Sequence, residues 1–90
     1  MALVGMDVEH VQNIGRQLQQ QAEAITHVIS AVDGLIAQAE GAWKGQDAIQ
    51  FRDWWNSQHK PHLQQASEAV RGLGQSALNN ASEQAQVSSR

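Results

Sequence analysis

The sequence contains no cysteine, no tyrosine, a single proline and a single phenylalanine. Without cysteine, disulfides and thiolate chemistry are excluded. The six basic and nine acidic residues are scattered, so no basic face for nucleic acid is formed. No apolar run is long enough to span a membrane, and the first six residues lack the basic start and long apolar core of a secretory signal. The 90 residues suffice for one small domain, which often gains stability from a partner.

Signatures of catalysis and of cofactor binding are also missing. Gly72-Leu73-Gly74 is too short for a phosphate-binding loop, and no serine lies in a nucleophile elbow. His59 and His62, three residues apart, form at most an incomplete metal site, and packed or partly exposed histidines are the better interpretation. We therefore predict a protein that is not an enzyme, with no cofactor and no metal. A metal-binding helical bundle built on these histidines is kept as a distant alternative.

The first half of the chain carries a heptad pattern. Its apolar residues fall into three registers with seven-residue spacing: Val11, Leu18, Ile25, Val32 and Ala39; Ile14, Val28 and Leu35; Ala22, Ile29, Ile36 and Trp43. This spacing keeps side chains on one face of a helix and predicts a helix over about 7–40, with Asp7 as its N-cap. The stripe is wider than one two-stranded seam requires. Gly15 and Gly34 are expected to mark close packing.

A second helix is predicted after a glycine-containing turn at 41–45. It should span about 46–82, with Asp47 near its positive end and a kink at Pro61. Its apolar stripe is expected to consist of Ala48, Phe51, Trp55, His59, His62, Leu63, Ala66, Ala69, Val70, Leu73 and Ala77. The remaining residues, 83–90, lack a periodic apolar pattern and are predicted to fray.

The predicted fold class is all-α, a single domain over 1–90. Two helices joined by a tight turn form an antiparallel hairpin, and the wide first stripe would stay partly wet in a monomer. A second hairpin covering it would complete a four-helix bundle, so we predict a dimer. The expected core and dimer-interface residues are Val11, Ile14, Leu18, Ile25, Val28, Ile29, Val32, Leu35, Ile36, Phe51, Trp55, Leu63, Val70 and Leu73.

Trp43-Lys44-Gly45 lies at mid-chain between two helical patterns, and Phe51 and Trp55 follow at helical spacing. From about Met6 to Ser82 this layout resembles the early-secreted-antigen-like proteins named for their Trp-Xaa-Gly motif. The resemblance implies a secreted, helical-hairpin homodimer or heterodimer exported by a type VII secretion ATPase without a cleaved signal peptide.

The resemblance also assigns roles to the turn. Trp43 and Gly45 would supply the turn half of a composite export signal, and Trp43 is expected to plug the hairpin end. Trp54 lies off the main stripe and is either a flanking contact or an exposed anchor for a partner. The family's tail signal is a tyrosine followed four residues later by an acidic residue. Here Asn79 precedes Glu83 at that spacing, so either the chain pairs with a tyrosine-bearing partner or its tail is read differently, and the first option favours a heterodimer.

The sequence thus predicts a small, secreted, non-enzymatic interaction protein of the type VII pathway. The alternative is an adaptor or chaperone hairpin that binds the helical N-terminus of a larger secreted effector or toxin. Both functions depend on a protein partner, and neither involves nucleic acid or a direct membrane span.

Overall fold

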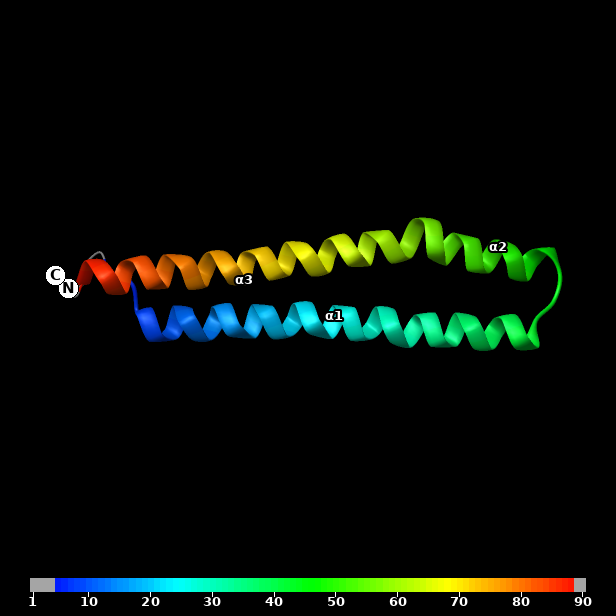
Figure 1. Cartoon of the computed structure of the whole chain (residues 1–90), viewed down its shortest axis with the longest axis horizontal. Helices are drawn as coiled ribbons and strands as arrows, with labels where there is room; N and C mark the ends of the chain where they lie inside the picture. The colour runs from blue at the N-terminus through cyan, green and yellow to red at the C-terminus, as the bar shows by residue number, and fades with distance from the viewer. Residues whose placement is uncertain (1–4, 89–90) are drawn as a thin grey trace.

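The computed structural model describes residues 5–88, which form an antiparallel hairpin of two helical rods measuring 67 × 17 × 15 Å (Figure 1). The first rod is α1 (Val8–Ala42). The second consists of α2 (Gln46–Trp54), a π-helical turn η1 (Trp55–His59) and α3 (Lys60–Ser88). No strand occurs among the described residues, and the predicted all-α hairpin is confirmed.

The ends of α1 are fixed by local hydrogen bonds. The Asp7 carboxylate accepts from the His10 backbone N–H at 3.1 Å and satisfies one of the free donors of the first turn. At the other end the Trp43 N–H donates to the Ala39 carbonyl at 2.8 Å. Gly45 then adopts a φ of 111°, a backbone conformation that residues with a side chain rarely adopt. The chain reverses here, and α2 begins at the next residue.

The hairpin core changes character along its length. In the half nearer the turn, Ile29, Ile36 and Trp55 are buried together. In the half nearer the termini the seam is made of small residues with seven-residue spacing: Gly15 and Ala22 on α1, and Ser67, Gly74 and Ala81 on α3. The two backbones approach closely there, because a Cβ atom placed on Gly74 would lie 2.8 Å from the Gly15 carbonyl oxygen.

The structure changes two expectations about packing. Gly15 marks close packing, but a Cβ atom on Gly34 would have no neighbour within 4 Å. The predicted apolar stripe of the second helix does not face α1 throughout, since Phe51 and Leu73 are exposed in the hairpin. The inward positions in α3 are small or polar residues that an apolar pattern does not reveal, and the extra residue of the π turn moves these positions one residue along the sequence relative to a continuous α-helix.

The expected kink at Pro61 takes the form of that π turn. The Lys60 N–H donates to the Trp55 carbonyl, five residues back, and the ribbon bulges outward between α2 and α3 (Figure 1). Pro61 has no N–H, and in a regular α-helix its ring would clash with the carbonyl of Ser57. The wider turn immediately before the proline relieves this clash.

The prediction that the tail frays is also corrected. Helix α3 continues through Ser88, and residues 89–90 lie outside the described part of the chain. Ala81 is fully buried, and Gln84, beyond the predicted helix end at 82, is half-buried. None of the helices among residues 5–88 combines the length and apolar character needed to cross a lipid bilayer.

Candidate interaction surface

One long side of the hairpin is apolar. Ile14, Val28 and Leu35 are multiples of seven residues apart and exposed, and Leu35 keeps 59% of its surface accessible. These three residues, their half-buried neighbours on α1 and the apolar residues on the same side of α3 are called the apolar face. It consists of Ile14, Leu18, Ile25, Val28, Val32, Leu35, Leu63, Val70 and Leu73. Ile25, Val32 and Leu63 pack against the core from this side.

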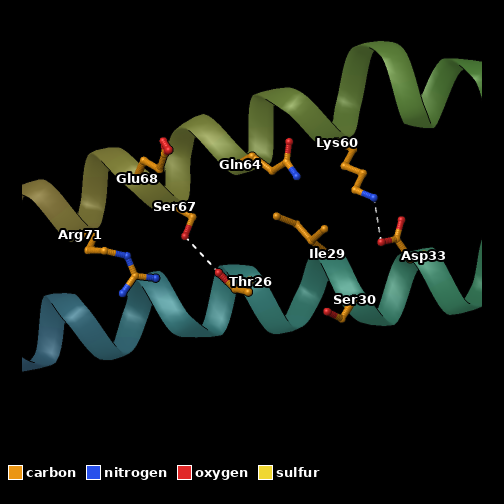
Figure 2. Close-up of a pocket in the computed structure, with 9 residues that line it drawn as sticks. All are labelled: Thr26, Ile29, Ser30, Asp33, Lys60, Gln64, Ser67, Glu68 and Arg71. Atoms are coloured by element: carbon orange, nitrogen blue, oxygen red, sulfur yellow. Dashed lines mark hydrogen bonds and ion pairs between the residues drawn. The ribbon is translucent and has the colours of Figure 1, made fainter.

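The opposite side is a polar groove of about 540 Å³ between α1 and α3 (Figure 2). Its lining residues are Thr26, Ile29, Ser30, Asp33, Lys60, Gln64, Ser67, Glu68 and Arg71. The charged side chains of the paired rods therefore gather away from the apolar face. This segregation leaves the apolar face without charges of its own.

Asp33 ties the second rod to the first across the π turn. Its Oδ1 accepts from the Trp55 indole N–H at 2.8 Å, and its Oδ2 accepts from the Lys60 ammonium at 3.0 Å. The hydrogen bond from Trp55, followed by that from Lys60, holds the pKa of the Asp33 carboxyl below its usual value. Because Trp55 and Lys60 are the first residue of η1 and the residue that follows it, Asp33 fixes both ends of the π turn.

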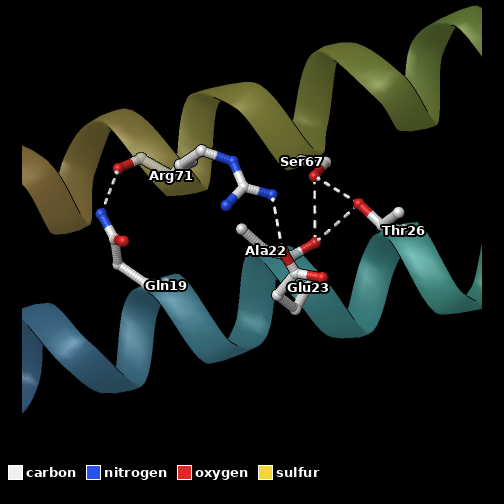
Figure 3. Close-up of polar contacts among 6 residues, drawn as sticks. All are labelled: Gln19, Ala22, Glu23, Thr26, Ser67 and Arg71. Atoms are coloured by element: carbon white, nitrogen blue, oxygen red, sulfur yellow. Dashed lines mark hydrogen bonds and ion pairs between the residues drawn. The ribbon is translucent and has the colours of Figure 1, made fainter.

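Closer to the termini, hydroxyl and amide groups join the rods (Figure 3). Ser67 donates to the Ala22 carbonyl at 3.0 Å, and its hydroxyl lies 3.2 Å from that of Thr26. The Gln19 amide donates to the Arg71 carbonyl at 3.3 Å, and the Arg71 guanidinium lies 3.4 Å from Glu23. These contacts satisfy the buried Ser67 and leave the groove side polar.

Aromatic side chains gather at the turn end. The Trp43 and Phe51 rings lie 5.3 Å apart, and those of Trp54 and His59 lie 5.0 Å apart. Trp43 packs against Phe51 and keeps 42% of its surface exposed, so the single hairpin covers it only in part. The residues Trp43, Asp47, Gln50, Phe51 and Trp54 line an open hollow of about 520 Å³.

The structure sorts the predicted interface residues into three groups. Ile29, Ile36 and Trp55 are buried within the hairpin. The half-buried ones are Val11, Leu18, Ile25, Val32, Leu63 and Val70. The exposed ones are Ile14, Val28, Leu35, Phe51 and Leu73, joined by Trp43, Gly45 and Trp54 at the turn end. The predicted set therefore mixes residues that close the hairpin with residues that the hairpin leaves uncovered.

The two histidines considered for a metal are exposed, and His59 lies against Trp54. Within residues 5–88, no three His, Asp or Glu side chains come close enough together to hold a metal ion. Sequence reasoning missed the Asp33 contacts, because an aspartate on the polar side of a helix is ordinarily solvated. It also missed Asp47 as a lining residue of the aromatic hollow.

Comparisons with known proteins complete this description. No curated protein and no solved structure matched the chain. A family model, described as proteins of 100 residues with WXG, matches residues 4–87. That span covers the first rod, the Trp43-Lys44-Gly45 turn and all but the last residue of the second rod. The chain belongs to the WXG100 family.

Proposed function

We propose that this chain is a non-enzymatic substrate of a type VII secretion system, exported as a hairpin dimer whose Trp43–Gly45 turn forms part of the export signal. Its family generally comprises secreted proteins that form dimers. The observation that carries the proposal is the apolar face, which the hairpin itself does not cover.

The apolar face supports dimerisation on energetic grounds. Its exposed residues include Ile14, Val28 and Leu35 on α1 and Leu73 on α3. Covering a fully exposed aliphatic side chain contributes about 1.5–3 kcal/mol, and these residues, which are 40–60% exposed, each contribute part of that amount. Several of them together offset part of the entropy that association loses. A second copy of the hairpin presents the same long apolar face. The dimer would then bury the apolar face and leave the polar groove outside.

The turn end supports recognition by the export machinery. Trp43 is half-exposed on a turn whose shape depends on Gly45, so an indole is held outward at a fixed position. An ATPase that reads this end requires the same side chain and the same turn. Secretion would proceed without a cleaved signal peptide.

The test is to compare export with folding. Trp43→Ala should reduce the secreted fraction severalfold in a host that carries the secretion system, while the helicity and thermal unfolding of the purified protein change little. Val87→Ala is the matched control, because Val87 is 61% exposed in α3, at the opposite end of the hairpin from the turn, and lines neither hollow at the turn end. If both substitutions lower export equally, or if Trp43→Ala lowers stability as much as export, the turn is not a signal.

The adaptor alternative makes a different prediction. An adaptor hairpin would stay monomeric alone and associate when mixed with the helical N-terminus of a larger secreted protein. Sedimentation of the purified chain at micromolar concentration separates the two, since the proposed function requires stable association between small hairpins.

A further inference from the structure

The aromatic residues of this chain are concentrated at one place. Three of its four tryptophan and phenylalanine residues, Trp43, Phe51 and Trp54, line the same hollow at the turn end. They keep 42%, 42% and 58% of their surface exposed. The fourth, Trp55, is buried in the hairpin core. Large exposed aromatic groups are typical of the centres of protein interfaces, and the hairpin's own packing does not account for these three.

The π turn extends this aromatic surface. Residues five positions apart point in different directions on an α-helix, but the i→i+5 pairing of a π turn brings them to one side. Trp54 and His59 therefore lie side by side, with their rings 5.0 Å apart. We call Trp43, Phe51, Trp54 and His59 the aromatic strip. It runs from the turn along α2 onto η1.

The charge at the strip is negative. Of the five residues that line the hollow in the described chain, only Asp47 is charged. The basic residues nearby are engaged elsewhere: Arg52 lies 3.7 Å from Glu40 and 3.5 Å from Asp53, and the Lys44 ammonium donates to the Glu40 carbonyl. The position of Asp47 in the first turn of α2 suits the helix dipole, yet its side chain also faces the hollow.

We propose that the aromatic strip is a docking site for an amphipathic helix of another protein, which places an apolar side chain in the hollow and an arginine or lysine beside Asp47. The basic group gains a carboxylate partner and an aromatic face together, an arrangement that suits arginine in particular. The inference rests on the proposed function, because it specifies the chemistry of the partner that receives the turn end.

The test uses two fluorescein-labelled amphipathic peptides, alike except that one carries arginine and the other glutamate at the edge of the apolar face. Fluorescence anisotropy with the full chain should show that the arginine peptide binds about tenfold more tightly, a difference that one well-placed charge contact produces. Trp54→Ala should weaken its binding by about tenfold or more, as expected for an interface hot spot. Val87→Ala, an exposed apolar position that lines neither hollow at the turn end, should leave it unchanged.

Charge reversal gives the sharper result. Asp47→Lys should invert the preference so that the glutamate peptide binds more tightly, whereas Asp53→Lys, a reversal outside the hollow, should not. Circular dichroism confirms that both variants keep their helices. Equal binding of the two peptides to the unaltered chain would overturn the inference, as would tight binding to Trp54→Ala. A fall in self-association of Trp54→Ala, with no change in peptide binding, would show that a second copy occupies the strip.

The outcomes separate this inference from the proposed function. The peptide experiment requires no secretion system, so the expected preference can hold even if Trp43→Ala is exported normally, and the export role would then fail alone. Conversely, loss of export in Trp43→Ala together with indifferent peptide binding leaves the export role and removes the docking site.

Discussion

Gly74 lies where the two rods come closest. A Cβ atom added there would meet the Gly15 carbonyl oxygen at 2.8 Å, and backbone cannot move aside as a flexible side chain can. Gly74→Ala should therefore destabilise the hairpin by about 1–3 kcal/mol, the usual result of overpacking. Urea unfolding followed by circular dichroism measures the change.

Gly72 provides the matched comparison, two residues away in the same helix. A Cβ atom on Gly72 would have no neighbour within 4 Å. Gly72→Ala should stabilise the protein by roughly 0.5–1 kcal/mol, because alanine favours helix more than glycine does. Were both alanine variants stabilising, the close approach at Gly74 would not exist in solution.

Asp33 makes the stability of the hairpin depend on pH. The pKa of its carboxyl in the folded protein lies below the ordinary value of an aspartate, because the carboxylate accepts hydrogen bonds from Trp55 and Lys60. A depressed folded pKa contributes stability that is fully present above the unfolded pKa and is lost as the pH falls through the folded value. Asp33→Asn should therefore lower the melting temperature at neutral pH, and the difference from the unaltered chain should shrink once the pH falls below about 3.8.

Melting curves of both proteins between pH 7 and pH 2 test this point. Asp53→Asn is a suitable control, since Asp53 bonds to its neighbour Arg52 and not across the hairpin. A difference between Asp33→Asn and the unaltered chain that stays constant across the whole range would mean that the carboxylate charge contributes nothing.

At the scale of the element, the π turn η1 accommodates Pro61 and keeps the inward faces of α2 and α3 on the same side of the second rod. Removing one residue from it should convert it to an α-helical turn without rotating α3 relative to α2. Deletion of Ser57 alone should cost about 3 kcal/mol, because Pro61 then sits inside a regular helix. Deletion of Ser57 combined with Pro61→Ala should recover most of that loss, as judged by thermal unfolding.

Deletion of Gln65 tests whether stability depends on the rotation of α3 about its own axis relative to α1. Gln65 is exposed in α3, so its side chain is dispensable. Its removal would rotate every later residue of α3 by about 100° and turn Gly74 and Ala81 away from α1. This variant should lose much more stability than the Ser57 deletion with Pro61→Ala, and equal stability of the two would contradict the role assigned to η1.

The sequence predicts the elements of this fold better than their contacts. Heptad spacing locates α1 and its broad apolar stripe, and the glycines locate the turn, because each depends on a local preference. The inward face of α3 could not be predicted in the same way. Ser67, Gly74 and Ala81 are buried through the close approach of a distant segment, and neither serine nor glycine indicates burial by its own chemistry.

The candidate interaction surface was likewise predictable only where it depends on a pattern or motif in the sequence. The exposed positions Val28 and Leu35 belong to an apolar register visible in the sequence, and Trp43 and Gly45 belong to a visible motif. The Trp54–His59 pair was not predictable, because it exists only where the helix widens into a π turn. The depressed pKa of Asp33 likewise requires two partners that are 22 and 27 residues away in sequence.

At the scale of the whole molecule, the hairpin has two unlike sides. The polar groove holds the charged side chains that tie the rods together, and the apolar face holds aliphatic residues that neither rod covers. Such a molecule gains from association on one side and from hydration on the other. Association should therefore respond to charge placed on the apolar face and not to charge placed in the groove.

Leu35→Glu tests this division directly. Leu35 is 59% exposed in the single hairpin, so glutamate is tolerated there by the monomer. A dimer that covers the apolar face would bury an unpaired carboxylate, a penalty of several kcal/mol, and its dissociation constant should rise on the order of 100-fold or more. Ser30→Glu introduces the same charge on the groove side and should leave association unchanged. Sedimentation velocity over a concentration series measures both, and similar weakening by the two substitutions would place the dimer contact elsewhere on the hairpin.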